Sequence, residues 1–323
     1  MSMTGLNPSR RTAQNYRDFA RFEAAGRSRE YETLANAVAS DDVVLTFLAK
    51  LPAIKRQPNL FFAAARLLLG DVPDLPGVRH LIQRRREELV SVMLARRTQT
   101  NEVGRCATLL PAIARVPGPL ALIEVGASAG LALLMDRYSY DYDGHLLQGA
   151  GNDSPLLCCH VEGNVPLPRR LPTVVWRAGL DLNPLDVSND EDVNWLRCLV
   201  WPGQPEREVR LQAAIETARI EPPEVVRGDL LVDLPALVAR APRDATIVVF
   251  HSAVLAYVNT ETRREFASLI DALGVRWLSN EGANVLSGVD LPSDEGAPFV
   301  LIEDGSRALA LTHPHGDWIR WLN

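Results

Sequence analysis

A turn of small residues between two apolar runs carries the clearest chemistry in this sequence. The stretch Leu120-Ala-Leu-Ile-Glu-Val-Gly-Ala-Ser-Ala-Gly-Leu131 opens with an apolar run that predicts a strand buried on both faces. Glu124 follows the run, and Gly126 and Gly130 enclose three small residues. A ligand could therefore touch the backbone of this turn, and the helix predicted from Leu131 would offer N–H groups to polar or anionic atoms.

The spacing Glu-x-Gly-x-x-x-Gly differs from the dinucleotide-binding fingerprint G-x-G-x-x-G and from the phosphate-binding loop G-x-x-x-x-G-K-[ST]. Two interpretations stay open from this stretch alone. Either the turn binds a cofactor, or it is an ordinary strand-to-helix turn whose small residues let the helix pack closely on the sheet.

Acidic residues end two later strands. Asp181 closes the predicted strand Thr173–Asp181, at the position where dinucleotide-binding folds use an acid to bind ribose hydroxyls. It lies well beyond the usual ~20 residues after the turn, so this interpretation requires an insertion between the two strands. Asp229, in Arg227-Gly-Asp229, follows a third short strand, although Gly-Asp is also an ordinary turn dipeptide.

His251 follows the buried run Ala245–Phe250 and is the best single catalytic candidate. In an open α/β sheet the carboxyl end of a central strand lies over the ligand crevice, and histidine exchanges protons near neutral pH. We therefore predict that His251 is a general base. The structural alternative is a histidine that hydrogen-bonds neighbouring backbone.

The polar run Thr98–Arg105 interrupts the helical pattern before the first strand. Loop statistics favour a helix–helix connection in which Thr100 caps the next helix. If the run instead lies beside the glycine turn, Asn101, Glu102 and Arg105 are expected to contact substrate. Tyr138 and Ser252 are further candidates for substrate contact.

Periodicity predicts an all-helical region followed by an α/β region. Helices are predicted at residues 13–25, 29–38, 42–51, 59–69, 78–97, 189–200, 206–219 and 262–273, with starts at Ser28, at Ser40 or Asp41, and at Pro58, and with stops at Gly26 and Gly70. An irregular insertion covers about 138–172, with a hairpin near Leu156–Val161. A strand at Val275–Leu278 and a hairpin around Asp304-Gly305 end the chain. We predict two parts, residues 1–118 and residues 119–323.

Composition narrows the classes of function. The chain is 47% hydrophobic, which excludes a mainly disordered protein, and its apolar runs fall short of a membrane span. Its four cysteines show no C-x-x-C spacing, and His313 and His315 have no evident third ligand, so no metal site is predicted. Residues 1–118 carry 18 Lys and Arg against 11 Asp and Glu, but these charges alternate as on solvated helix faces, so nucleic acid is not the expected partner. A cytoplasmic enzyme fits this composition.

Residues from about 119 onward resemble a class I S-adenosylmethionine (SAM)-dependent methyltransferase domain, a Rossmann-like, mostly parallel sheet with a C-terminal antiparallel hairpin. In that family the acid of the first motif orders the loop and its glycines admit the methionine part of SAM. More narrowly, the chain is similar to an uncharacterised bacterial family with a methyltransferase-like fold. The stretches that carry this similarity are Thr100–Arg105, Leu122–Leu131, Asp181–Asp186, Arg227–Asp229 and Val249–Ser252.

The resemblance implies a SAM-dependent methyltransferase acting on a small molecule, with the helical N-terminal region as lid and substrate selector. SAM would lie along the turn, Asp181 would bind its ribose and Asp229 its adenine. The residues expected to bind the cofactor are Glu124, Gly126, Ala127, Ser128, Gly130, Asp181, Leu182, Asp229 and Leu230. The acidic or Asn-Pro-Pro motif that many methyltransferases carry after the fourth strand is replaced here by His251-Ser252. A non-catalytic SAM- or nucleotide-binding protein is therefore the alternative, and an NAD-linked enzyme is a weaker one.

Overall fold

The computed structural model describes residues 8–151, 154–283, 285 and 299–322, which form two compact units. The first unit holds the chain up to Gln99 together with Asp190–Glu208, and the second holds Thr100–Asn189 and Val209 onward. The sequence analysis instead placed the boundary after residue 118. The difference arises because the segment after Thr100 forms a buried helix of the second unit, and because residues 190–208 add their aromatic side chains to the first.

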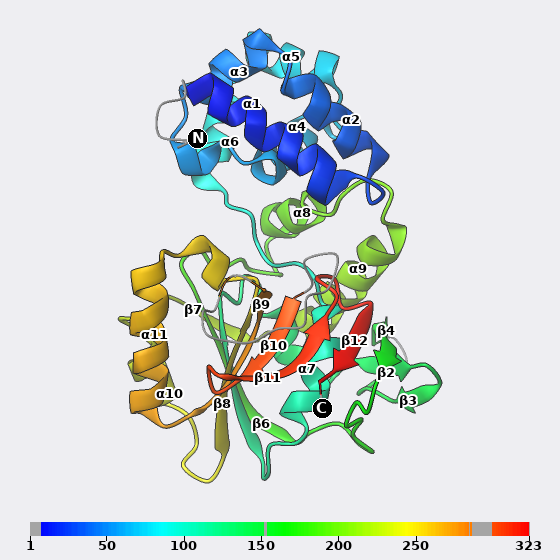
Figure 1. Ribbon diagram of the computed structural model, residues 1–323, viewed down its shortest axis with the longest axis vertical. Coiled ribbons are helices and arrows are strands. Elements are labelled where there is room, and N and C mark those ends of the chain that lie inside the picture. Colours follow the sequence, from blue (N-terminus) through cyan, green and yellow to red (C-terminus); the bar gives the residue numbers. More distant parts are fainter. Residues whose placement is uncertain (1–7, 152–153, 284, 286–298, 323) are drawn as a thin grey trace. The chain divides into compact units, whose positions relative to one another are not determined.

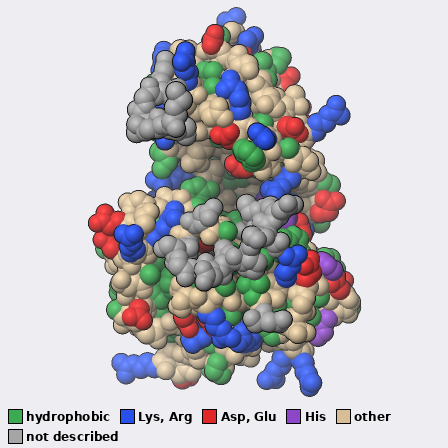
Figure 2. Space-filling view, in the orientation of Figure 1, with side chains coloured by type: hydrophobic (Ala, Val, Ile, Leu, Met, Phe, Trp, Pro, Cys, Tyr) green, Lys and Arg blue, Asp and Glu red, His purple; other side chains and the backbone are tan. Residues whose placement is uncertain are grey.

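The first unit is helical, as predicted. Its elements are α1 (Pro8–Asp18), the π-helix η2 (Phe19–Ala24), α2 (Arg29–Val38), α3 (Asp42–Ala49), the 3-10 helix η3 (Ala53–Lys55), α4 (Pro58–Leu69), α5 (Leu75–Arg84), α6 (Arg86–Ala95) and α8 (Asp190–Cys198). Figure 2 shows basic and acidic side chains interspersed on the visible face of these helices. Such interspersed charges are typical of a solvated surface.

Capping residues define the ends of these helices. The Ser28 hydroxyl accepts a hydrogen bond from Tyr31 N–H, and the Asp41 carboxylate accepts one from Val44 N–H, which confirms both predicted starts. Gly70 ends α4 in the left-handed conformation, as predicted. The single helix predicted over 78–97 is broken at Arg85, whose backbone leaves the helical conformation between α5 and α6.

Aromatic side chains form the core of the helical unit. Phe62 lies 4.9 Å from Tyr31 between ring centroids, and Phe19 lies 5.2 Å from Trp201. Trp195 of α8 is fully buried and donates its indole N–H to the carbonyl of Arg97. Two tryptophans from the segment 190–208 are thus built into this core, and this burial explains why the segment belongs to the helical unit.

The second unit contains, among its described residues, a nine-stranded sheet in the order β5-β12-β11-β10-β9-β8-β1-β6-β7. Its strands are β1 (Leu120–Val125), β5 (His160–Glu162), β6 (Val174–Asp181), β7 (Glu224–Arg227), β8 (Thr246–Ser252), β9 (Arg276–Gly282), β10 (Phe299–Glu303), β11 (Arg307–Thr312) and β12 (Trp318–Trp321). The strands β7-β6-β1-β8-β9 are parallel and have the 3-2-1-4-5 order of a doubly wound fold.

Two layers cover this sheet. Figure 1 shows α10 (Leu234–Val238) and α11 (Thr260–Leu273) on one side, and α7 (Arg105–Ile113) with a small sheet on the other. The small sheet joins β3 (His145–Leu147), β2 (Ser139–Tyr142) and β4 (Leu156–Cys158). The 3-10 helices η4 (Leu131–Leu134) and η5 (Leu255–Tyr257) follow β1 and β8, and α9 (Pro205–Ile220) crosses the division between the units.

The C-terminal antiparallel hairpin is confirmed, with β10 and β11 joined through Asp304 and Gly305, both at positive φ. The hairpin predicted near Leu156–Val161 is wrong. β4 instead pairs in parallel with β2, whereas β5 extends the large sheet beside β12. Strand pairing of this kind joins residues far apart in the chain, and local pattern does not reveal it.

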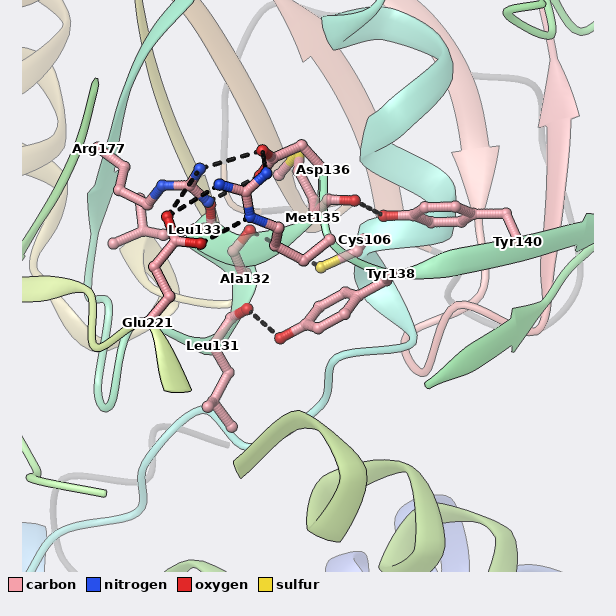
Figure 3. Close-up of polar contacts among 11 residues, drawn as sticks. Cys106, Leu131, Ala132, Leu133, Met135, Asp136, Tyr138, Tyr140, Arg177 and Glu221 are labelled. Carbon is pink, nitrogen blue, oxygen red and sulfur yellow. Dashed lines mark hydrogen bonds and ion pairs between the residues drawn. The ribbon is translucent and has the colours of Figure 1, made fainter. Parts of the chain in front are cut away.

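The segment after the glycine turn is shorter than predicted. Instead of an α-helix, η4 is a 3-10 helix of four residues. Its Ala132 and Leu134 carbonyls accept the N–H groups of Met135 and Arg137, whereas the Leu131 and Leu133 carbonyls need partners from elsewhere. Figure 3 shows how side chains supply partners: the Tyr138 hydroxyl donates to Leu131 O at 2.6 Å, and the Tyr140 hydroxyl donates to Met135 O at 2.6 Å. Tyr138, predicted as a substrate contact, is fully buried in this structural role.

A buried ion pair holds the other side of η4. Arg177 of β6 donates to Leu133 O at 2.9 Å and forms two hydrogen bonds with Asp136, at 2.7 and 3.0 Å (Figure 3). The exposed fractions of the Arg177 and Asp136 side chains are 10% and 5%. Water therefore screens this pair little, and it fixes the segment that leaves the glycine turn.

Breaking this pair is expected to destabilise the fold. Asp136→Asn removes the nearest charge from the buried Arg177 and leaves it Leu133 O and Glu221, which lies 3.7 Å away, so the cost should approach but not exceed the ~3–5 kcal/mol of a fully broken buried pair. The melting temperature measured by calorimetry should therefore fall by several degrees. Glu88→Gln, which alters the exposed pair with Arg85, serves as the control and should leave it unchanged. Equal melting temperatures for the two variants would contradict the assignment.

Candidate functional site

The candidate site lies at the carboxyl end of β1, where the order of the parallel strands reverses. β1 pairs with β6 on one side and with β8 on the other, so the crossovers leave a crevice beyond the strand ends. Gly126 has φ 71° and Gly130 has φ 70°, a backbone conformation that favours glycine. A Cβ atom at Gly126 would collide with the side chain of Val254, which follows β8. The turn and the segment after β8 thus pack directly against each other where the crevice begins.

Ser128 lies at the middle of the turn in a strained conformation. Its φ is 56°, unusual for a residue with a side chain. Its N–H donates to Asp181 Oδ2 at 2.8 Å, and its carbonyl accepts from Leu185 N–H at 3.0 Å. The Ser128 hydroxyl is fully buried and has no hydrogen-bond partner among the described residues. The backbone of Ser128 therefore fixes the turn, while its side chain has an unused donor and acceptor.

Asp181 accepts hydrogen bonds from backbone N–H groups at this position. Besides Ser128 N–H, it accepts Asn183 N–H through Oδ1 at 2.7 Å, and it is 8% exposed. The structure thus brings Asp181 to the glycine turn, as expected if the insertion between β1 and β6 is discounted. The ribose contact stays a prediction; each carboxylate oxygen can accept a further hydrogen bond.

Glu124 is the unusual carboxylate of the site. Burial, then the nearby charge of Asp181, hold its pKa well above the ordinary value of 4.5, while Arg105 opposes the shift. Its Oε2 atom is buried and has no hydrogen-bond partner among the described residues. A buried polar atom of this kind calls for a ligand or water.

Glu124 lines a narrow pocket with a volume of about 10 Å³, on the order of one water molecule. The pocket combines the glycine turn with the polar run before α7. Its lining residues are Thr100, Asn101, Glu102, Val103, Glu124, Ala127, Leu131 and Ala132. Of the two interpretations of this run, the structure therefore supports the one that places it beside the turn, and Thr100 does not cap α7.

A turn that contains His315 and Gly316 contacts this polar run and holds it in place. Glu102 is buried and lies 3.1 Å from His315 Nδ1 and 3.4 Å from Arg210. Gly104 and Gly316 approach so closely that a Cβ atom at either position would collide with backbone of the other segment. His315, for which the sequence indicated no role, therefore holds a pocket-lining carboxylate.

Arg105 bridges the run and the sheet. Its side chain donates to Pro314 O at 2.7 Å and to Ser252 O at 3.2 Å, and its guanidinium lies over the Phe299 ring. Ser252 is 6% exposed and its hydroxyl accepts a hydrogen bond from Asn280. Both predicted substrate residues thus lie at the carboxyl edge of the sheet, bonded to other parts of the protein.

His251 is placed differently from the prediction. Its side chain is fully buried, Nδ1 lies 2.7 Å from Glu281 Oε1, and Nε2 lies 3.0 Å from the indole nitrogen of Trp277. An indole N–H can only donate, so Nε2 accepts and Nδ1 carries the proton. This geometry leaves neither ring nitrogen for a substrate proton, so it does not support the predicted role as general base.

Asp229, predicted to bind the adenine, and Leu182 and Leu230, predicted to bind the cofactor, occupy three different environments. Asp229 is half-buried and accepts Leu231 N–H within its own turn at 2.8 Å. Leu182 is 52% exposed beside Asp181, whereas Leu230 is 9% exposed and packs in the core with α10. An exposed apolar residue at the carboxyl edge suits a ligand better than one in the core, so Leu182 is the better placed of the two.

Comparison with known proteins identifies the family. Residues 13–321 match the model of a family described as "Uncharacterized protein conserved in bacteria (DUF2332)". The chain belongs to this family. No curated protein and no solved structure matched. Within the described residues, no group of three His, Cys, Asp or Glu side chains could hold a metal ion, and no helix is long and apolar enough to cross a membrane.

Glu124 should make the folded state less stable as the pH rises. Its folded-state pKa is raised, so between pH 4.5 and that higher value the folded state keeps a proton that the unfolded state has released. The contribution of this group to the free energy of unfolding is fully present below pH 4.5. It is lost as the pH rises above that value, by at most about 1.4 kcal/mol per pH unit. Glu124→Gln should therefore gain melting temperature relative to the wild type between pH 5 and pH 8. A constant difference would contradict the assignment.

His251 should occur as the tautomer protonated at Nδ1. In ¹⁵N spectra at neutral pH, its Nδ1 should show a bonded proton and its Nε2 none, because Trp277 donates to Nε2. The signal is assigned by its disappearance in His251→Gln. A proton on Nε2 would overturn the hydrogen-bond network described above.

Proposed function

We propose that this chain binds SAM at the carboxyl end of β1 and transfers its methyl group to a small molecule. The support is the 3-2-1-4-5 order of the parallel strands, the glycine turn at the switch point, and acidic residues at the ends of β1 and β6. SAM would supply an electrophilic methyl group on a sulfonium, and the protein's contribution would be to align it with the acceptor.

The observation that carries the proposal is the unpartnered oxygen of Glu124. SAM carries an ammonium group, and a buried carboxylate with a vacant acceptor is a suitable partner for it. The small pocket beside Ala127 has room for a group of that size only. The ammonium of SAM would therefore occupy the pocket, and the rest of the molecule would lie outside it, with the nucleoside along the carboxyl edge of the sheet.

Along that edge, Asp181 and Asp229 are the acids at the ends of β6 and β7, and Leu182 is the exposed apolar residue between them. The ribose hydroxyls would donate to Asp181, whose oxygens are already oriented by two backbone N–H groups. The adenine amino group would donate to Asp229, and Leu182 would cover the ring.

A non-catalytic SAM-binding protein is the second candidate. The observation that favours it is the occupation of both His251 nitrogens by Glu281 and Trp277. A sensor needs the pocket and the acids but no base. The two candidates differ in turnover: a methyltransferase forms S-adenosylhomocysteine from SAM when its acceptor is present, and a sensor does not.

The cofactor proposal is tested by calorimetric titration with S-adenosylhomocysteine and with 5′-methylthioadenosine, which lacks the amino-acid part. Wild type should bind both. Glu124→Gln should lower the affinity for S-adenosylhomocysteine by about tenfold or more, because a charge-assisted hydrogen bond contributes about 1.5–3 kcal/mol. It should leave the affinity for methylthioadenosine unchanged. Affinity for S-adenosylhomocysteine should rise with pH, because Glu124 must lose its proton to pair with the ammonium.

Glu303→Gln is the control variant. Glu303 is also largely buried, but it is bonded to Arg276 and Arg307 at the opposite edge of the sheet. Its substitution should leave both affinities unchanged. If wild type binds neither compound at millimolar concentration, the cofactor proposal is wrong. If Glu124→Gln lowers the affinities for both compounds equally, the ammonium does not lie at Glu124.

A further inference from the structure

The loop after β8 packs directly against the glycine turn. Ala253 has φ 58°, a strained value for a residue with a side chain, and its N–H donates to Asn280 O at 3.1 Å. The next residue, Val254, fills the space beside Gly126, which has room for no side chain of its own. A shift of this loop would therefore change the shape of the turn.

One buried carboxylate holds the loop in place. Glu281 lies at the carboxyl end of β9 and is 1% exposed. Its Oε1 accepts Val254 N–H at 2.8 Å and Leu255 N–H at 3.0 Å, and it also accepts the Nδ1 proton of His251. Three donors thus converge on one oxygen of Glu281, and two of them belong to the loop itself.

His251 and Trp277 orient that carboxylate. Trp277 packs in the core below α11 and donates to His251 Nε2, so the imidazole presents its Nδ1 proton to Glu281. The His251 ring also packs edge-on against Phe266 of α11. The imidazole is thereby held in one orientation by the core, and it fixes Glu281 in turn.

We propose that Glu281 is a positioning residue of the ligand site, and that His251 acts through it. Glu281 holds the segment Ala253–Leu255 against Gly126, so the shape of the glycine turn is set before a ligand arrives. The proposal rests on the proposed function only in its choice of S-adenosylhomocysteine as the ligand for the binding measurement. Positioning of the loop itself is measurable without a ligand.

Two measurements test the proposal on the full-length protein. Amide hydrogen exchange at Val254 and Leu255 should accelerate about tenfold or more in Glu281→Ala, because both N–H groups lose their acceptor. The dissociation constant for S-adenosylhomocysteine should rise by about tenfold. Glu281→Gln keeps an oxygen for these donors and should remain closer to the wild type in both measurements. Val254→Ala, which keeps the carboxylate and removes the side chain packed against Gly126, should weaken binding even if both Glu281 variants fail to fold.

Glu303→Ala is again the matched control, since it removes a largely buried carboxylate at the opposite edge of the sheet. It should lower the melting temperature without changing exchange at Val254 or the dissociation constant. Unchanged exchange in Glu281→Ala would overturn the proposal, as would unchanged binding in Val254→Ala when wild type binds the probe. If wild type binds no S-adenosylhomocysteine, the cofactor proposal fails, and the exchange rates alone decide whether Glu281 holds the loop.

Discussion

The hydrogen bond from Ser128 N–H to Asp181 is the interaction on which the candidate site depends. It joins the turn after β1 to the end of β6, the neighbouring strand. Ser128 can keep its left-handed backbone because this bond, together with the one from Leu185 N–H to its carbonyl, offsets the strain. Asp181 therefore fixes the shape of a turn in which residues 127–130 are buried.

Glu281 repeats this arrangement at the loop after β8. A carboxylate at a strand end accepts backbone N–H groups from a loop that contains a strained residue, Ala253. Charge-assisted hydrogen bonds from backbone are strong and directional, and burial keeps water from competing for them. The glycine turn and the loop after β8 are therefore both held by carboxylates at strand ends, and among the described residues the Oε2 atoms of Glu124 and Glu281 are buried without a hydrogen-bond partner.

Segments from both ends of the second unit complete the site. Glu102 and His315 are 213 residues apart in the sequence, and the glycines beside them allow the two backbones to touch. Arg105 adds bonds to Pro314 and Ser252, and so ties α7 to β8. The polar run before α7 is thus part of the floor of the crevice, and the domain boundary falls before it for this reason.

Sequence alone determined the local features of this protein. The apolar runs of β1, β6 and β8, the caps at Ser28 and Asp41, and the turn at Asp304-Gly305 follow from burial, capping and positive φ, which act within a few residues. The turn with Glu124 and the acid Asp181 were found in this way. An acid at the end of β9 was an equal signal for Glu281, but its strand carried no glycine motif to draw attention to it.

Only the tertiary structure decided which of these residues meet. It placed the Thr100–Arg105 run at the turn, and α8 with the helical unit, through contacts across long stretches of chain. It also decided the role of His251. The sequence puts this residue at a strand end over the crevice, but the alternation of side chains turns it to the face covered by α11, where Glu281 and Trp277 occupy both nitrogens. Which face a strand residue takes depends on the sheet around it, and that information lies in strands distant in the chain.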